Sequence, residues 1–288
     1  MMDMYREDSE LSEVSRAAGL HPVKTSDDVR EVMRQGLELA AMTSGRFDPT
    51  VGPLIRLWGI GSGSARVPAP PLIQAALGLV DWRRVESAEE ARTIYLRRLG
   101  MSLDFGALVK GYAAVETGRV LSARGVKSAI VDIGGSILAL GRGPRGGPWR
   151  VGLQKPGAPR GTLFGAVLAG DEAVNTSGVY ERFFVAEGRR WHHIMDTRTG
   201  YPVENGIEAV TVISPRLRNA DGPSLSILAL GVDAGLAFAA KIGVDAVIVG
   251  SDGRLSMTPG ARRRFQLLDT SYTIASRPSP FLYTRARF

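Results

Sequence analysis

The sequence predicts an α+β fold with mixed or antiparallel sheets and packed helices, rather than a doubly wound parallel sheet. Short apolar runs between residues 129 and 170 are separated by Gly-Gly and Pro-Gly pairs, which is typical of hairpins. Long amphipathic stretches on both sides of these runs predict helices. The chain has 288 residues, of which 44% are apolar and 23% charged, so it can bury a core.

The first predicted helix covers residues 26–42. Ser26 can cap it, two aspartates suit the positive end of its dipole, and its apolar residues fall on one face. The other elements follow in chain order: a short helix at 72–77, a strand at 93–99, a helix at 107–123, strands at 129–133, 136–140, 149–153 and 163–168, a hairpin of 181–187 with 191–196, a strand at 209–213, helices at 220–230 and 232–241, and a strand at 245–249.

Composition excludes several classes of protein. There is no cysteine and there are only three histidines, which excludes disulfides, thiolate nucleophiles and cysteine-ligated metals, so any metal must be held mainly by oxygen. No apolar run is long enough to span a bilayer, and the acidic first residues do not resemble an export signal. The sequence leaves the compartment undetermined.

Net charge is +7, and most of it lies at the C-terminus. Residues 260–288 hold six arginines and one acid, so the rest of the chain is nearly neutral. A basic tail with aromatic residues keeps open a nucleic-acid or interaction protein, but we expect a solvated or loosely packed extension and no nucleic-acid partner. Glycine makes up 35 residues, above the usual share of about 7%, which favours tight turns and places where backbone approaches a ligand.

Residues 104–112 place an acid, a glycine and a lysine at the entry to a helix. This segment can cradle a phosphate with Lys110 while Asp104 accepts a hydrogen bond, or it can be an ordinary capped helix. Gly134 and Gly135 suit either a tight hairpin turn or a ligand edge. Asp221 opens a helix, where it is either a cap or a ligand for Mg²⁺.

Hydroxyls, two adjacent histidines, an acid and an arginine gather at residues 175–180 and 191–200, around a predicted hairpin and the turn that follows it. His192 and His193 would face opposite sides of a strand. A hydrolase with Ser177, His193 and Asp196 is compatible with the residue types, but the sequence lacks the usual nucleophile elbow.

Taken together, these segments resemble the ApbE family, the FAD:protein FMN transferases. The motifs that carry the resemblance stand in the family's order: Tyr5-Arg-Glu-Asp-Ser-Glu-Leu11, Gly45-Arg-Phe-Asp-Pro-Thr-Val-Gly-Pro-Leu54 with Leu57-Trp-Gly59, Asp104 to Tyr112, the Gly-Gly turn, Trp149-Arg-Val-Gly152, Thr176-Ser-Gly-Val-Tyr180, His192-His-Ile-Met-Asp196 with Thr199-Gly200, and Ala220-Asp221.

The resemblance implies an ApbE-like (T-fold-like) single domain over residues 1–259, lacking the family's first strand with its Met-Gly-Thr, followed by a basic extension over 260–288. It implies that Mg²⁺ assists transfer of FMN from FAD to a threonine or serine hydroxyl of an acceptor protein, with release of AMP. Relatives are commonly exported lipoproteins, so membrane contact would come through an anchor or the acceptor.

Carried over by position, the resemblance implies three sets of site residues. The flavin nucleotide would be lined by Tyr5, Arg46, Phe47, Asp48, Asp104, Lys110 and Met195. The metal would be held by Ala107 through its backbone oxygen, by Asp221 and by Ser224. His193 would serve in polar positioning or proton transfer.

The chain departs from the family pattern at several positions. Leu225 replaces a threonine that usually completes the metal site, Ser136 replaces the acid of the Gly-Gly-Asp turn, and Val115 replaces an acid after Lys-Gly-Tyr. These departures keep two alternatives open: a weakened FAD-binding relative, and a FAD pyrophosphatase.

Overall fold

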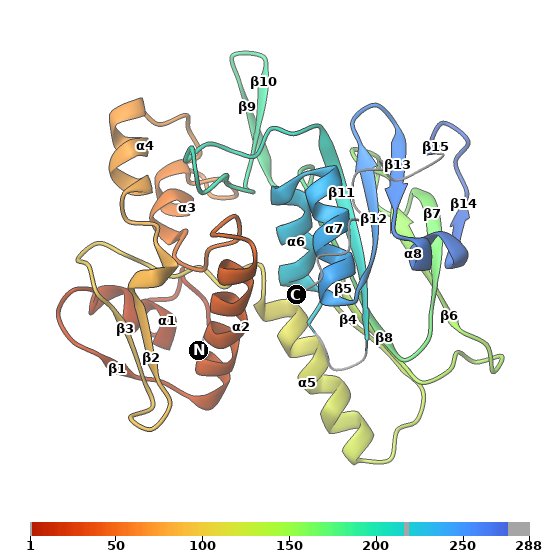
Figure 1. The fold of residues 1–288 in the computed structure, drawn as a ribbon, viewed down its shortest axis with the longest axis horizontal. Coiled ribbons are helices and arrows are strands. Elements are labelled where there is room, and N and C mark those ends of the chain that lie inside the picture. Colours follow the sequence, from red (N-terminus) through yellow and green to blue (C-terminus); the bar gives the residue numbers. More distant parts are fainter. Residues whose placement is uncertain (1, 216–218, 276–288) are drawn as a thin grey trace, which may run out of the picture. The chain divides into compact units, whose positions relative to one another are not determined.

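The computed structural model describes residues 2–215 and 219–275, which form the mixed α+β fold that the sequence predicts (Figure 1). Two compact units make up the chain: Met1–Val109 with Val179–Val203, and Lys110–Gly178 with Glu204–Phe288. Neither unit is continuous in sequence, because the chain returns to the first unit after building half of the second. A single domain over residues 1–259 stays a prediction.

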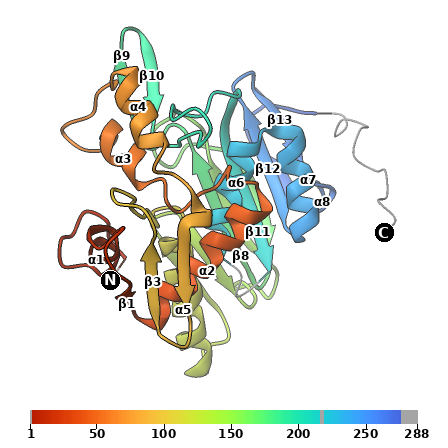
Figure 2. The ribbon, with the colours of Figure 1, turned by 60° about the vertical axis from the view of Figure 1, so that its left-hand side comes forward.

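Helices and two small sheets build the first unit. A three-stranded antiparallel sheet has the order β1-β3-β2, and β9 and β10 form a hairpin of their own. Helix α1 packs against β3 and α2 against β2 (Figure 2). The elements are α1 (Glu10–Arg16), β1 (Val23–Lys24), α2 (Asp27–Met42), α3 (Gly52–Trp58), α4 (Pro70–Leu77), the 3₁₀ helix η1 (Trp82–Arg84), β2 (Val85–Ala88), β3 (Thr93–Leu96), β9 (Phe183–Ala186) and β10 (Arg189–His192).

An aromatic cluster joins α3 to the hairpin within this unit. The rings of Trp58 and Trp191 lie 5.2 Å apart, and both indoles are buried. The Trp58 Nε1–H donates a hydrogen bond to the Gly200 oxygen at 2.9 Å. Gly200 has φ +76°, a conformation that favours glycine, and a Cβ there would overlap Ile73. These contacts fix the loop after β10, which carries Met195.

The second unit contains a seven-stranded sheet in the order β15-β13-β12-β11-β8-β5-β4 and a three-stranded sheet in the order β14-β7-β6. Every pairing in them is antiparallel except β13 with β15. The elements are α5 (Val109–Ala123), β4 (Ala129–Ile133), β5 (Ser136–Leu140), β6 (Trp149–Gln154), β7 (Leu163–Ala169), β8 (Glu172–Gly178), β11 (Ile207–Pro215), α6 (Asp221–Leu230), α7 (Val232–Ile242), β12 (Asp245–Gly250), β13 (Arg254–Met257), α8 (Pro259–Arg264), β14 (Phe265–Leu267) and β15 (Thr273–Ile274).

The core of the second unit lies around β11 and β12. Both strands are almost wholly buried, as expected for apolar runs rich in β-branched residues. Helix α6 packs against β11 and β8, and α7 packs against β12 (Figure 1). The start of α6 therefore lies beside the centre of the large sheet.

Several boundaries differ from the sequence prediction. The strand expected at 93–99 ends at Leu96, and the helix expected from Ala107 begins at Val109. The turn expected from the motif at 176–180 is restricted to residues 179–180. Residues 175–178 instead end strand β8, where Asn175 pairs with both β5 and β11 and residues 176–178 pair with β11. The tight-turn interpretation of Gly134 and Gly135 is confirmed, since both have positive φ between β4 and β5.

The expectation of a loosely packed extension is wrong for residues 260–275. Strand β14 pairs with β7, β15 pairs with β13, and the Arg264 guanidinium binds Glu172 at 2.7 Å as well as Asp245. These pairings cover parts of β7 and β13 that would otherwise present unpaired backbone groups at a sheet edge. The rest of the basic extension lies outside the described residues.

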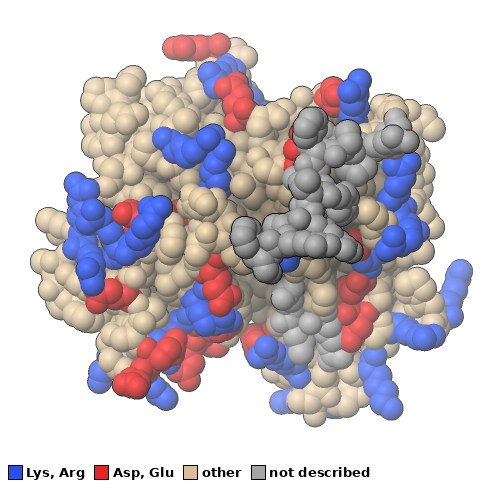
Figure 3. Space-filling model, viewed as in Figure 1, with Lys and Arg blue, Asp and Glu red and all other residues tan. Residues whose placement is uncertain are grey.

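Charge is mixed on the face shown in Figure 3, where acidic and basic side chains stand next to one another. Among the described residues, no helix has the length and hydropathy needed to cross a membrane.

Candidate active site

In the second unit, the carboxylate of Asp221 is buried at the start of α6. It is 2% exposed, and it makes no capping hydrogen bond to its own helix. Its Oδ2 instead accepts a hydrogen bond from the Gly111 N–H of α5 at 2.7 Å, and its Oδ1 accepts one from the Ser136 hydroxyl at 2.8 Å. The simple capping interpretation of this aspartate is therefore wrong, because its side chain reaches across to α5 and β5.

Gly111 allows this contact because it has no side chain. A Cβ at this position would lie 2.8 Å from both the carboxyl carbon and Oδ1 of Asp221, and would also overlap the Asn219 amide oxygen. The first-turn amides of α5 have no partner within the helix. Asp221 satisfies one of them from a distant part of the sequence.

Burial raises the pKa of Asp221 to about 6, although the hydrogen bonds from Ser136 and Gly111 and the charge of Lys110 oppose the rise. Lys110 extends from the exposed side of α5 and donates to the Gly134 oxygen at 3.1 Å. A cation beside Asp221 would offset the cost of burying the ionised form.

The donors around Asp221 suit a hard cation only in part. Among residues 2–215 and 219–275, no group of three or more His, Cys, Asp or Glu side chains could hold a metal. Oxygen ligands from carbonyls, hydroxyls, phosphate or water are the kind that Mg²⁺ takes, so a buried carboxylate supplies one ligand and the others must come from such groups. Ala107, predicted to offer its carbonyl, lies in the turn before α5, in the first unit.

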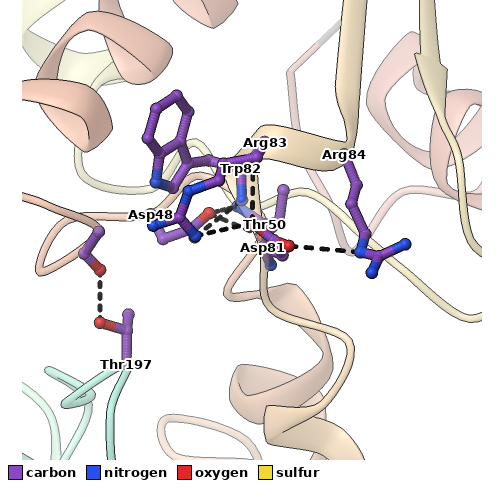
Figure 4. A network of polar contacts seen from close by, with 8 residues as sticks. Asp48, Thr50, Asp81, Trp82, Arg83, Arg84 and Thr197 are labelled. Carbon is purple, nitrogen blue, oxygen red and sulfur yellow. Dashed lines mark hydrogen bonds and ion pairs between the residues drawn. The ribbon is translucent and has the colours of Figure 1, made fainter.

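In the first unit, Asp48 organises the loop that follows α2. It is 7% exposed, and its Oδ1 accepts hydrogen bonds from the Thr50 N–H at 2.8 Å and the Thr50 hydroxyl at 2.7 Å. Its Oδ2 accepts from the Trp82 N–H at 3.0 Å, and the Thr50 hydroxyl oxygen accepts from the Asp81 N–H (Figure 4). Burial raises the pKa of Asp48 in spite of these donors. The carboxylate thus ties this loop to η1.

The same loop places two other predicted flavin residues. Phe47 is buried, and Arg46 lies 3.6 Å from the Asp196 carboxylate. Burial favours the neutral form of Asp196, but Arg198 and Arg46 together hold its pKa below the ordinary value. The Thr197 hydroxyl donates to the Gly45 oxygen (Figure 4), so the loop after β10 and the loop after α2 are joined.

The side chains of Tyr5 and Asp104 also interact electrostatically within this unit. Burial raises the pKa of Asp104, against the hydrogen bond from the Gly106 N–H and the charges of Arg182 and Arg56. Burial and the Asp104 charge raise the pKa of Tyr5, whose side chain is largely exposed. Asp104 lies before α5 rather than at its first turn, so it does not cap that helix.

Met195 and His193 follow β10. Met195 is buried in the aromatic cluster, while His193 is half-buried and its Nδ1 lies 3.1 Å from the Arg182 oxygen. The opposite-face expectation agrees with His192, which is buried and hydrogen-bonded to the Val203 oxygen at 2.8 Å.

The structure gives the hydrolase triad no support. The Ser177 hydroxyl shares a hydrogen bond with Ser224 at 2.7 Å, and the Asp196 carboxylate pairs with Arg198 at 3.1 Å. Each proposed member is engaged by other groups.

The sequence does not reveal the roles of Gly111, Asn175 and Arg182. Gly111 and Asn175 lie inside the motifs described above, but only the tertiary contacts of α5 and β8 with α6 show that they surround Asp221. Arg182 lay in the predicted hairpin and had no neighbour in sequence to connect it with Asp104.

The ApbE family profile matches residues 1–248. A FAD:protein FMN transferase of Klebsiella pneumoniae is 34% identical, with 95% of this chain and 85% of that protein covered. A protein of the same name from Treponema pallidum is 33% identical, covering 95% of this chain and 80% of that protein.

Solved structures agree with the sequence comparison. The apbe protein of Thermotoga maritima has a TM-score of 0.84 at 27% identity, covering 91% of this chain and 85% of that chain. The flavinyl transferase ApbE of Pseudomonas stutzeri in its apo form has a TM-score of 0.77 at 33% identity, covering 90% and 80%. With its motifs, its fold and these relatives in agreement, the chain belongs to the ApbE family.

Proposed function

We propose that this chain is a Mg²⁺-dependent FAD:protein FMN transferase. A threonine or serine hydroxyl oxygen of an acceptor protein attacks the FMN-side phosphorus of FAD. The bond from that phosphorus to the oxygen shared with AMP breaks, AMP leaves with that oxygen, and the hydroxyl loses its proton. FMN remains on the acceptor as a phosphoester.

One observation carries the proposal: Asp221 is buried and turned away from its own helix towards the first turn of α5, where Lys110 lies. A buried carboxylate costs stability unless a cation or a chemical role accounts for it. The names of the relatives supply the reaction in which such a carboxylate and a lysine would meet a pyrophosphate.

We assign the residues of this chain the following roles. Lys110 binds a phosphate oxygen as a point charge, Asp221 with the Ala107 carbonyl holds Mg²⁺, and Asp104 with Tyr5 accepts or donates hydrogen bonds at the nucleotide. Arg46, Phe47 and Met195 contact the flavin. Asp48, whose oxygens are engaged by Thr50 and Trp82, contributes by holding the loop that carries Arg46 and Phe47.

Bound Mg²⁺ would neutralise charge on the pyrophosphate oxygens and so favour displacement. His193 is proposed as a polar positioning group, since its imidazole is tied to the hairpin through the Arg182 oxygen. We propose no nucleic-acid partner, and membrane contact is proposed only through the acceptor or an anchor.

To test this proposal, the purified chain is incubated with FAD, MgCl₂ and a threonine-containing acceptor peptide. We expect FMN addition to the peptide by mass spectrometry and AMP release by chromatography, and neither product with Asp221→Asn. Ser226→Ala is the matched control, because Ser226 is buried in the same helix and donates only to the Gly222 oxygen. A peptide with alanine in place of threonine controls for the attacking hydroxyl.

The same experiment separates the alternatives. AMP and FMN without labelled peptide, even with an excess of acceptor, would support the FAD pyrophosphatase, in which water replaces the hydroxyl. FAD binding by fluorescence titration with no product would support a weakened relative, the alternative that Leu225 in place of threonine favours. If no flavin binds at millimolar concentration, the proposal is wrong.

A further inference from the structure

A chain of buried hydrogen bonds connects Asp221 to two neighbouring strands of the large sheet. Ser136 on β5 and Asn175 on β8 are directly opposite each other in the antiparallel register, so their side chains share one face of the sheet. Ser136 is 2% exposed and Asn175 is 5% exposed. Their polar groups therefore find partners inside the protein or remain unsatisfied.

Ser136 lies between two acceptors. Its hydroxyl is 2.8 Å from Asp221 Oδ1 and 3.2 Å from Asn175 Oδ1, so its single proton goes mainly to the nearer, charged Asp221 oxygen. With the Gly111 N–H on Oδ2, the Asp221 carboxylate is held at both oxygens by groups from different elements. Rotation about the bond to the carboxyl carbon would break both contacts.

Asn175 continues the chain towards α6. Its Nδ2–H donates to the Ser224 hydroxyl oxygen at 2.9 Å, and the Ser224 hydroxyl donates to the Asp221 backbone oxygen at 2.8 Å. Because this uses the only Ser224 proton, the Ser177 hydroxyl is the donor in the 2.7 Å contact with Ser224. Ser177 follows Asn175 by two residues and so points to the same face of β8.

These contacts saturate the Ser224 hydroxyl. A hydroxyl offers one proton and two lone pairs, and here the proton goes to Asp221 while the lone pairs receive Asn175 and Ser177. Ser224 thus has no lone pair left for a cation, which argues against the role as metal ligand that the resemblance implies.

We propose that Ser136 and Asn175 are positioning residues that fix the Asp221 carboxylate for a divalent cation, with Ser224 as a structural link between them and α6. The inference rests on the proposed function of Asp221. Ser136 occupies the position of the acid in the family's Gly-Gly-Asp turn. In this chain it is a neutral hydrogen-bond donor to the Asp221 carboxylate.

The test measures Mn²⁺ binding to the full chain by the electron paramagnetic resonance signal of free Mn²⁺. Partners that orient metal ligands typically contribute 10- to 100-fold in affinity, so we expect Ser136→Ala and Asn175→Ala to weaken Mn²⁺ binding by roughly that factor. Ser136→Thr keeps the hydroxyl and should restore binding. Thr176→Ala is the strand-matched control, because its hydroxyl pairs with Thr211 instead.

Thermal melting without metal accompanies each titration, so that a merely structural role is recognised. Unchanged Mn²⁺ affinity in folded Ser136→Ala and Asn175→Ala, with affinity lost in Asp221→Asn, would overturn the positioning inference alone. Unchanged affinity in Asp221→Asn as well would overturn the proposed metal role, and the inference with it. If Ser136→Ala fails to fold, the Mn²⁺ affinity of Asn175→Ala is compared with that of Ser136→Thr. Weaker binding in Asn175→Ala supports the inference, and equal binding overturns it.

Discussion

Replacing Gly111 with alanine should disable the contact between α5 and Asp221. The new methyl carbon would lie 2.8 Å from the Asp221 carboxyl carbon, so the carboxylate must move and the hydrogen bond from the residue 111 N–H must lengthen or break. Alanine improves helix propensity by about 1 kcal/mol. A hydrogen bond to a charged group contributes about 1.5–3 kcal/mol, and overpacking costs about 1–3 kcal/mol.

We therefore expect Gly111→Ala to lower the free energy of unfolding by about 1.5–5 kcal/mol and to reduce AMP release from FAD by at least roughly tenfold. Urea denaturation followed by circular dichroism measures the first effect, and chromatography of AMP measures the second. Gly36→Ala is the control, since a Cβ on this α2 residue meets Pro49 at 3.2 Å and Leu108 at 3.3 Å, so it adds crowding without contacting Asp221.

If Gly111→Ala unfolds at the same urea concentration as the parent and releases AMP at the same rate, then α5 and α6 tolerate a side chain between them. The Gly111 N–H would then not hold the Asp221 carboxylate.

Three further predictions concern Asp221, Leu225 and Arg264. Because the pKa of Asp221 is raised to about 6 in the folded protein, its contribution to stability is complete below about pH 4 and is lost as pH rises through about 6, by roughly 2–3 kcal/mol. Urea denaturation without divalent cations should show this pH dependence, and Asp221→Asn should lack it. Equal pH slopes for the two proteins would contradict the prediction. Leu225→Thr should strengthen Mg²⁺ dependence by adding an oxygen ligand, and Leu225→Val should not; identical Mg²⁺ titrations would show that residue 225 does not face the metal. Arg264→Ala should lower the free energy of unfolding by about 1–3 kcal/mol, because the part-buried carboxylates of Glu172 and Asp245 lose their ion-pair partner. Urea denaturation measures this loss, and the exposed Arg263→Ala is the control that should change it little. Equal losses in both variants would refute the role of the ion pairs.

Local sequence patterns predicted most of the second unit. Gly134 and Gly135 between apolar runs indicated a hairpin, and the structure confirms it, because a two-residue turn with positive φ is a local property. Strand β8 was missed at Asn175 for the opposite reason. Its polar residues break the apolar alternation of a strand, and only pairing with β5 and β11 stabilises it there.

The site residues also divide into those predicted by local sequence and those that depend on tertiary contacts. Asp221 was identified from its place at a helix start, but its partners Gly111 and Ser136 are distant in sequence, so their hydrogen bonds could not be derived from spacing. Residues 260–275 pack into sheets although the sequence predicts a loose extension, because that prediction depends on the arginines and the Pro/Ser-containing stretch of the whole 260–288 segment. The ion pairs of Arg264 depend on Glu172 and Asp245, which only the sheet brings together.

The discontinuous first unit also constrains how the chain is made. Trp58 is synthesised long before Trp191 and Met195, the residues that complete its cluster. During translation, the apolar side of α3 around Trp58 therefore stays uncovered while the ribosome synthesises the strands of the second unit. We expect ribosome-bound chains that end before residue 191 to be the species most dependent on chaperones and most open to proteases.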